Sequence, residues 1–417
     1  IERSSGRKRK LFLVMSIISN LAVLAVFKYY NFFRENVAFL IEPLGIQTNL
    51  PFLAFLLPIG LSFHTFQAMS YTIEVYRGHQ KAERHFGIFS LYVLFFPQLV
   101  AGPIERPQNL LHQFREKHSF ETERVVDGLK LMLWGFFKKV VIADRVAVLV
   151  DTVYGDPTGY SGGPLLLATF FFAIQIYCDF SGYTDIAIGA AQVLGIRLMD
   201  NFKRPYYAKS IGEFWGRWHI SLSTWFKDYL YIPLGGNRVA VPRWYLNILI
   251  VFLISGLWHG ASWTFVIWGA LHGMYMIIGV MTSKLRTRVK NATGFSRFKI
   301  FDAGVRVVVT FALVCFAWIF FRANSLADAW YIITHLFSDL SLGVGGKSLG
   351  LDLIEIIIAF AAIAFMEAVH IIQEHRGMRS FLSTKPQWLR LSLYLLIILL
   401  ILLFGVFERR QFIYFQF

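Results

Sequence analysis

The chain has 417 residues, enough for two or three soluble domains by length alone. Composition excludes that organisation, because 56% of the residues are hydrophobic, only 16% are charged and the mean hydropathy is +0.53. The formal net charge of +15 does not indicate a nucleic-acid partner, because the basic residues lie in short segments between long hydrophobic runs.

Hydrophobic runs recur along the whole chain, and many approach the ~20 residues that cross a bilayer as a helix. In chain order they are Leu11–Phe27, Pro51–Phe66, Phe86–Val100, Pro164–Ile176, Tyr245–Leu257, Ala261–Val280, Val305–Phe321, Leu353–Ile372 and Leu391–Phe407. Nine such runs cannot all be buried helices of a soluble protein, because no amphipathic segments remain to cover them. The pattern predicts an all-α polytopic membrane protein.

Lysines and arginines cluster beside the ends of these runs. The clusters are Arg7–Lys10, Arg77/Lys81/Arg84, Lys284–Lys299, Arg376/Arg379 and Arg409/Arg410. The positive-inside rule places such segments in the cytoplasm. The chain begins with Ile1 inside a basic segment, so we expect the first membrane segments of the protein to precede it.

Residues 1–417 contain no internal repeat and no linker rich in proline or serine, which predicts a single membrane domain. The two cysteines, Cys178 and Cys315, lie in apolar runs and have the spacing of neither a disulfide framework nor a zinc site. We therefore expect no metal centre.

Three polar residues, Asp179, Ser181 and Asp185, lie within the apolar stretch "AIQIYCDFSGYTDIAIGAAQVLGI". Charged groups at membrane depth are costly, so they normally face protein or a water-filled cavity. Gly182 and Pro205 suggest a broken or re-entrant backbone, which is tolerated where protein buries it. The alternative is that both aspartates cap helix ends at the membrane surface.

Residues Ile211–Ile232 have the pattern of an amphipathic helix. One stripe holds Trp215, Trp218, Leu222, Trp225, Phe226 and Tyr229, and the opposite face holds Glu213, Arg217, Thr224, Lys227 and Asp228. Such a helix lies at the membrane surface or lines a polar cavity. His219 falls at the edge of the stripe, which favours an interfacial histidine.

Two more histidines lie in "SGLWHGASWTFVIWGALHG". His259 follows Trp258 and precedes Gly260, at a break between two apolar runs. Burial favours neutral imidazole, which can accept a proton, so His259 is either a candidate base or a hydrogen-bonded core histidine. His272 is thirteen residues further on, ~20 Å away along a continuous helix, and the pattern favours a core histidine there.

Four stretches together resemble the membrane-bound O-acyltransferase (MBOAT) family, in particular its bacterial alginate O-acetyltransferase branch. They are "YCDFSGYTDIAIGAAQVLGI", "NFKRPYYAKSIGEFWGRWHISLSTWFKDYLYIPLGGNR", "SGLWHGASWTFVIWGALHG" and the terminal "FIYFQF". The resemblance covers nearly the whole chain and is densest at residues 177–273, which it implies is the catalytic region. The chain departs from the family pattern at the front, where the first hydrophobic segments are absent.

The resemblance implies a bundle of about ten or more transmembrane and re-entrant helices around a central cavity, in the bacterial cytoplasmic (inner) membrane. It also implies that His259 is the central catalytic residue and that His219 is the second, which overturns the interfacial interpretation of His219. Members of this branch have no bound cofactor. They take an acetyl group from a cytoplasmic donor, acetyl-CoA or an acyl carrier, and pass it across the membrane.

An extracytoplasmic acetyltransferase partner, or the integral protein itself, is then expected to deliver the acetyl group to polysaccharide hydroxyls. His259 would act as base or as nucleophile. Both histidines should border a space that a narrow passage joins to the cytoplasmic face and a wider opening joins to the outer face. His219, Trp258, Ser181 or Tyr183 would contact the oxyanion, while Arg217 and Lys227 would meet donor phosphates. The expected substrate-binding residues are Trp258, Asp179, Ser181, Tyr183, Arg217, Trp218 and Asp228.

Two alternatives remain open at this point. The first is an enzyme of the same family that acts on another acceptor, by D-alanyl transfer to teichoic acid or by acylation of a lipid or protein. A transporter or flippase would instead place carboxylates such as Glu355 and Glu367 along a path at the bilayer midplane. Transporters are commonly built from two related halves, and the lack of a repeat counts against that class.

Overall fold

The computed structural model describes residues 1–46, 50–54, 58, 60–292, 298–342, 348–408, 412 and 413. Within these ranges the chain forms helices and connecting segments and no strand, which confirms the predicted all-α class. The helices in chain order are α1 (Gly6–Leu24), α2 (Tyr30–Ile41), α3 (Leu61–Arg77), α4 (Phe86–Leu94), α5 (Pro107–Leu110), α6 (Thr122–Phe136), α7 (Asp144–Gly155), α8 (Gly162–Val193), α9 (Ile211–Arg217), α10 (Ile220–Phe226), α11 (Val241–His259), α12 (Trp263–Met281), α13 (Ser283–Ala292), α14 (Lys299–Arg322), α15 (Leu326–His335), α16 (Leu353–His375), α17 (Met378–Ser383) and α18 (Gln387–Phe404).

Three π-helical turns join consecutive helices. They cover Ala25–Tyr29 between α1 and α2, Phe137–Ala143 between α6 and α7, and Lys227–Tyr231 after α10. Such turns are frequent at functional sites in other proteins. The first of them carries Lys28, a charged residue within a helical segment that is long and apolar enough to cross a membrane.

Seven helical segments among the described residues are long and apolar enough to cross a membrane, which confirms a multi-pass membrane protein. They are Gly6–Leu44, Gly162–Val193, Val241–His259, Trp263–Met281, Lys299–Arg322, Leu353–His375 and Gln387–Phe404. Two predicted runs form no span of their own. Phe86–Val100 gives only the nine-residue α4, and in Pro51–Phe66 the helix α3 begins at Leu61.

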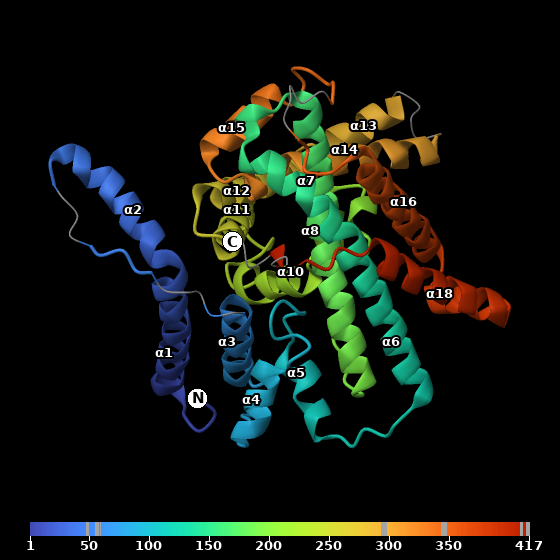
Figure 1. The fold of residues 1–417 in the computed structure, drawn as a ribbon. Coiled ribbons are helices and arrows are strands. Elements are labelled where there is room, and N and C mark those ends of the chain that lie inside the picture. Colours follow the sequence, from blue (N-terminus) through green and yellow to red (C-terminus); the bar gives the residue numbers. More distant parts are fainter. Residues whose placement is uncertain are drawn as a thin grey trace.

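Helix α8 runs through the middle of the molecule, and α6 lies along it (Figure 1). The prediction of a break at Gly182 is wrong, because α8 is continuous for 32 residues. Gly182 instead permits close packing: a Cβ added there would lie 2.8 Å from the carbonyl oxygen of Gly135 in α6. Gly189 and Gly128 form a second contact of this kind. Pro205 begins a short 3₁₀ turn in the connection that follows α8.

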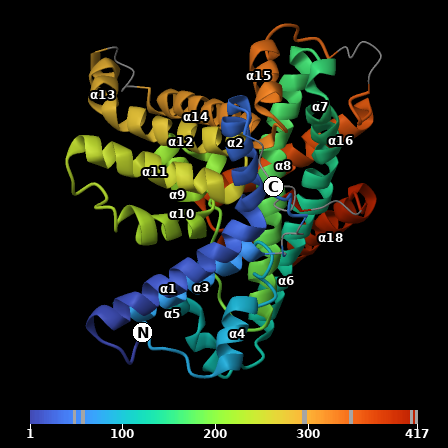
Figure 2. The same ribbon diagram turned by 90° about the vertical axis from the view of Figure 1, so that its left-hand side faces the viewer.

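Helices α11 and α12 form an antiparallel hairpin whose tip lies inside the molecule (Figure 2). Gly256 and Gly269 face each other, since a Cβ on Gly256 would lie 3.4 Å from the Cα of Gly269. The chain turns at Gly260, directly after His259. His259 therefore occupies the buried tip of the hairpin.

The basic clusters at the start of α1, in the loop after α3 and in α13 lie on one side of the molecule. The start of α1 and α13 lie on the same left-hand side in Figure 2. The guanidinium of Arg9 donates to the carbonyl oxygen of Tyr76 at 2.6 Å, which brings the loop after α3 to that side. This arrangement agrees with a shared location of Arg7–Lys10, the Arg77–Arg84 loop and α13. Residues 293–297 of the Lys284–Lys299 cluster, and the cluster Arg409/Arg410, lie outside the described residues.

The prediction of one amphipathic helix over Ile211–Ile232 is wrong. Helix α9 ends at Arg217, and α10 begins at Ile220. His219 between them has φ = 43°, the left-handed region that a side chain disfavours. Trp218 and Trp225 are 1% and 5% exposed. Burial of both rings in different surroundings requires the bend that a straight surface helix would lack.

Candidate functional site

The imidazole rings of His219 and His259 lie together in the interior. Their centroids are 6.4 Å apart and their planes are inclined by 61°. His219 occupies the bend between α9 and α10 and is 0% exposed, while His259 at the tip of the α11–α12 hairpin is 6% exposed. A non-glycine residue held at positive φ is often found at functional sites, where the surrounding packing stabilises the strained backbone.

Aromatic side chains enclose His259. Trp258, Trp268 and Phe321 lie with ring centroids 4.9, 5.0 and 5.4 Å from its imidazole. In this conformation His259 is therefore packed among rings and does not border the open passage predicted from the sequence. A substrate reaches the imidazole only if these rings move.

Asn201 fixes the tautomer of His219. Its Oδ1 accepts hydrogen bonds from the backbone N–H and the hydroxyl of Ser221, at 3.2 and 2.9 Å, and lies 3.1 Å from Nδ1 of His219. An oxygen that accepts from both donors assigns the proton of His219 to Nδ1, so Nε2 is the accepting nitrogen. Burial lowers the pKa of His219 to about 3, and the ring is neutral at pH 7.

Trp258 lies between both histidines and α3. Its ring is 6.2 Å from that of His219 and 5.4 Å from that of Phe63. The indole is 4% exposed, and its N–H has no hydrogen-bond partner among the described residues. A buried donor without a partner is costly, and such groups are often found where a ligand or substrate binds. The Trp258 indole therefore presents a hydrogen-bond donor here, and its predicted contact with an oxyanion stays a prediction.

The two aspartates of α8 form ion pairs within the helix, so the alternative that they cap helix ends at the membrane surface is wrong. Asp179 pairs with Lys139 at 2.8 Å, and Asp185 pairs with Lys138 at 2.7 Å. Lys138 also donates to the hydroxyl of Ser181 at 2.8 Å. Charges at membrane depth are here matched within the protein.

The segment of α8 that carries these charges lies next to His219, and the ring of Phe180 makes the contact. Phe180, between Asp179 and Ser181, lies 4.7 Å from the ring of His219. Asp179 also accepts a hydrogen bond from the backbone N–H of Ile413 at 2.8 Å. Only residues 412 and 413 of the terminal "FIYFQF" lie within the described part of the chain.

Two further predicted residues belong to the packed surroundings of the histidines. The hydroxyl of Tyr183 donates to the carbonyl oxygen of Pro97 at 3.2 Å. Trp218 is 1% exposed and packs on Phe202 and Trp318, with centroids 5.1 and 5.2 Å apart. Trp218 thus supports the bend at His219, and any role of these two side chains in binding substrate stays a prediction.

Arg217 and Asp228 lie apart from the two histidines in separate ion pairs. Arg217 pairs with Glu213 at 2.9 Å and with Glu374 at 3.0 Å. Asp228 pairs with Arg106 at 3.2 Å. A donor phosphate at Arg217 would have to compete with two carboxylates, and the predicted binding roles of both residues stay predictions.

His272 has the surroundings of a core histidine. It is 0% exposed, and the indole N–H of Trp215 donates to its Nδ1 at 3.2 Å. Because the chain turns at Gly260, α12 folds back along α11, and Trp268 contacts the rings of both His259 and His272, at 5.0 and 5.1 Å. No group of three or more possible metal-ligating side chains occurs among the described residues.

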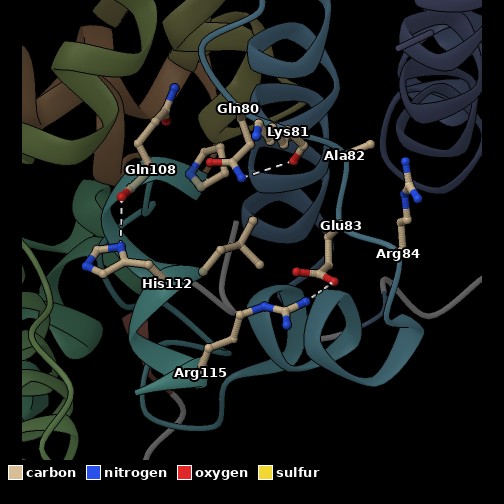
Figure 3. A pocket seen from close by; sticks show the side chains of 10 residues that line it. Gln80, Lys81, Ala82, Glu83, Arg84, Gln108, His112 and Arg115 are labelled. Carbon is tan, nitrogen blue, oxygen red and sulfur yellow. Dashed lines mark hydrogen bonds and ion pairs between the residues drawn. The ribbon is translucent and has the colours of Figure 1, made fainter. Parts of the chain in front are cut away.

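Figure 3 shows a polar pocket of about 360 Å³ that neither His219 nor His259 lines. Its walls come from the loop after α3 and from α5 and the turn that follows it. In Figure 3, Arg115 points toward Glu83, and the two form an ion pair at 2.6 Å. His112 lies 3.0 Å from the carbonyl oxygen of Gln108.

Reasoning from the sequence missed three residues of this region: Asn201, Lys138 and Lys139. Asn201 opens the quoted stretch "NFKRPYY", where an amide beside apolar residues was the available signal. The two lysines follow the apolar stretch "LMLWGFF". The available signal was that Asp179 and Asp185, in the next hydrophobic run, need cationic side chains as partners. Sequence spacing alone did not indicate which lysines would face α8.

Comparison with known proteins gives consistent matches. The family model described as the membrane-bound O-acyltransferase family matches residues 77–325. The chain is 39% identical over 367 residues to the probable alginate O-acetylase AlgI of Pseudomonas aeruginosa, covering 86% of this chain and 67% of that protein. It is 40% identical over 360 residues to the AlgI of Azotobacter vinelandii, covering 84% and 68%. It is 36% identical over 367 residues to the peptidoglycan O-acetyltransferase of Helicobacter pylori, covering 82% and 66%. The chain therefore spans about two thirds of the length of these relatives.

Proposed function

This chain belongs to the membrane-bound O-acyltransferase family, and from that premise we propose that it moves an acetyl group from a cytoplasmic thioester to hydroxyls of a cell-surface or secreted polysaccharide. It is a multi-pass membrane enzyme of the O-acyltransferase class. The observation that carries the proposal is the pair of buried histidines at the inner tip of the α11–α12 hairpin. The names of the relatives, an alginate O-acetylase and a peptidoglycan O-acetyltransferase, support a polysaccharide acceptor.

In the proposed reaction, an acceptor hydroxyl oxygen attacks the carbonyl carbon of the thioester, for which we propose acetyl-CoA. His259 takes the hydroxyl proton as the C–O bond forms. The C–S bond then breaks, and the proton passes to the leaving thiolate. The products are an acetyl ester and free coenzyme A, so atoms and charge balance.

Two neighbours complete the proposed machinery. The indole N–H of Trp258 donates to the oxyanion of the tetrahedral intermediate, where a donor in a site without water is most effective. His219 presents Nε2 as an acceptor beside His259, which supports a role as a neutral hydrogen-bond acceptor next to the base. A covalent acetyl-imidazole on His259 is the alternative, and rapid acid quenching of labelled enzyme distinguishes the two.

The location of the basic clusters supports a proposed direction of transfer, because the positive-inside rule assigns such clusters to the cytoplasmic side. The start of α11 and the end of α12 lie toward that side in Figure 2, and His259 lies at the opposite end of α11. Coenzyme A is too polar to cross ~30 Å of hydrocarbon, so only the acyl end of the donor would enter. We propose the bacterial cytoplasmic membrane as the location and an extracytoplasmic acetyltransferase as the partner that receives the group.

Sealed membrane vesicles test this proposal. Vesicles from a deletion host that carries the full-length protein are loaded with radiolabelled acetyl-CoA, and alginate oligosaccharide or peptidoglycan fragments are added outside. Label is expected on the external glycan or on a partner protein in vesicles with the wild type and not in vesicles with His259→Ala. Label that stays with the donor compartment in the presence of a competent partner would refute transfer across the membrane.

A further inference from the structure

Lys28 lies at an unusual position for a charged residue. It belongs to the π-helical turn Ala25–Tyr29 within the apolar segment Gly6–Leu44. An ammonium group at membrane depth is costly unless protein groups replace its water, and such residues commonly mark functional regions. Among the described residues Lys28 has no carboxylate partner within ion-pair distance; its partners are backbone oxygens at the end of α11.

The contacts converge on the three residues that end α11. The Lys28 ammonium donates to the carbonyl oxygens of Trp258 and His259, each at 2.8 Å. The hydroxyl of Tyr29 donates to the carbonyl oxygen of Leu257 at 2.9 Å. The last carbonyls of a helix have no hydrogen-bond partner within the helix. Here the side chains of Lys28 and Tyr29 donate to three of these carbonyls in succession. A cation at this end is also favoured by the helix dipole.

These bonds constrain the backbone that carries His259. The hairpin turn leaves α11 directly after this residue, because Gly260 is extended at φ = −157°. Gly260 also has no room for a Cβ beside the ring of Phe265. The direction of the imidazole therefore depends on where the final carbonyls of α11 are held. Lys28 holds two of them, and one belongs to His259 itself.

We infer that Lys28 is a positioning residue for His259, acting through the α11 carbonyls and without touching substrate. The inference rests on the proposed function. It assigns the α1–α2 arm, which is otherwise attached mainly through α1 and α3, a role in the geometry of the transfer site. A displacement of about 1 Å at a reacting group can cost about 100-fold in rate, so loss of these bonds should lower turnover.

The test compares variants of the full-length protein in vesicles from a deletion host, at several concentrations of labelled acetyl-CoA. Lys28→Met keeps an unbranched side chain of similar length but removes the donors. We expect kcat to fall at least about tenfold with KM for acetyl-CoA unchanged within about twofold, because the donor is not contacted. Lys28→Arg, which keeps a cationic donor, should recover most of the rate.

Arg34→Met is the matched control. Arg34 lies on α2, and its guanidinium also donates to a backbone carbonyl, that of Leu50 at 2.7 Å, away from α11. This variant should keep wild-type kcat. Wild-type kcat in a folded Lys28→Met protein would overturn the inference, and so would equal losses in Lys28→Met and Arg34→Met, which would mean that the arm acts only as a structural support.

A second variant keeps the inference testable if the Lys28→Met protein does not accumulate in the membrane. Tyr29→Phe removes one of the three bonds with almost no change of volume, and kcat should fall about fivefold, the value of one hydrogen bond. Unchanged kcat in Tyr29→Phe would then overturn the inference. Wild type and His259→Ala are measured in parallel. Absence of transfer by the wild type would overturn the proposed function itself, together with this inference, whereas an active wild type isolates the outcome for Lys28.

Discussion

Asn201 Oδ1 lies 3.1 Å from Nδ1 of His219 and holds this imidazole in one tautomer. The same oxygen accepts two hydrogen bonds from Ser221, so a single amide organises the bend between α9 and α10. The orientation of a histidine is commonly set by the bond that its second nitrogen makes. We therefore predict that Asn201 affects turnover, although only His219 and His259 are proposed to act in the transfer itself.

Replacing Asn201 by leucine should lower the transfer rate about 10- to 100-fold, because buried donors on His219 and Ser221 lose an acceptor worth about 1–3 kcal/mol. Initial rates per folded protein give the measurement. Asn247→Leu is the matched control, since Asn247 is also buried but donates to the carbonyl oxygens of Leu234 and Gly236. Equal effects of both variants on rate would argue against the role of Asn201.

Alanine variants of the three histidines should differ in their effects on the rate of transfer and on the yield of folded protein. His259→Ala is expected to abolish transfer, since loss of a general base typically costs about 10²–10⁴-fold. His219→Ala should reduce the rate strongly. His272→Ala should lower the yield of folded protein more than the rate, because Trp215 loses an acceptor and the surrounding rings lose a packing partner. A well-folded His259→Ala enzyme of wild-type activity would refute the catalytic assignment.

The sequence predicted the helical class and the multi-pass organisation, because apolar runs of membrane length have few other solutions. It failed where tertiary packing decides local structure. The wheel for Ile211–Ile232 placed the aromatic residues on one stripe, yet burial of Trp218 and Trp225 among different partners bends the chain at His219. Gly182 resembled a helix break but serves close packing of α6 on α8.

The candidate site was predictable only in part for a similar reason. Composition and spacing left His259 and His219 with two interpretations each, and the resemblance to a family singled them out. Their proximity required the hairpin turn at Gly260 and the bend at His219. Lys28 and Asn201 act through contacts that join residues distant in the sequence, so periodicity carried no signal for them.

The ion pair between Lys138 and Asp185 should contribute to stability in such a way that removing one partner costs more than removing both. Lys138→Met leaves the Asp185 carboxylate without its cation, and breaking such a pair typically costs about 3–5 kcal/mol. The double variant Lys138→Met/Asp185→Leu should regain more than half of the lost thermal stability, measured by the midpoint of unfolding in detergent. Losses that simply add in the double variant would show that the two charges are not coupled.

Glu105 predicts a pH dependence of stability. It is 0% exposed, and burial raises the pKa of its carboxyl to about 7. The carboxyl of an unfolded glutamate has a pKa near 4.3. Between about pH 4.5 and 7 the Glu105 carboxyl is therefore ionised in the unfolded state and protonated in the folded state. Raising the pH across this range favours unfolding. Below about pH 4 both states are protonated, and Glu105 contributes no dependence.

Glu105→Gln should therefore flatten the fall in the unfolding midpoint between pH 5 and 7, relative to the wild type in the same detergent. Glu116→Gln is the control, because Glu116 is exposed and its side chain remains in solvent. The informative quantity is the difference between the curves, since other groups titrate in both proteins. Parallel curves for wild type and Glu105→Gln would contradict the assignment.

Orientation in the membrane can be tested with single cysteines in a protein whose Cys178 and Cys315 are replaced by alanine. Lys81→Cys and Arg288→Cys lie in basic segments on the side that the positive-inside rule assigns to the cytoplasm, and both positions are exposed. A membrane-impermeant thiol reagent should not label them in intact cells and should label them after permeabilisation.

Ala327→Cys is the positive control. The 24-residue α14, which precedes it, is ~36 Å long, more than the ~30 Å hydrocarbon core, so the end of α14 lies on the opposite side of the membrane. Retained acetyl transfer establishes that each cysteine variant is folded. Labelling of Lys81→Cys and Arg288→Cys from outside, with Ala327→Cys protected, would reverse the orientation and place the donor thioester on the other face of the membrane from the one proposed.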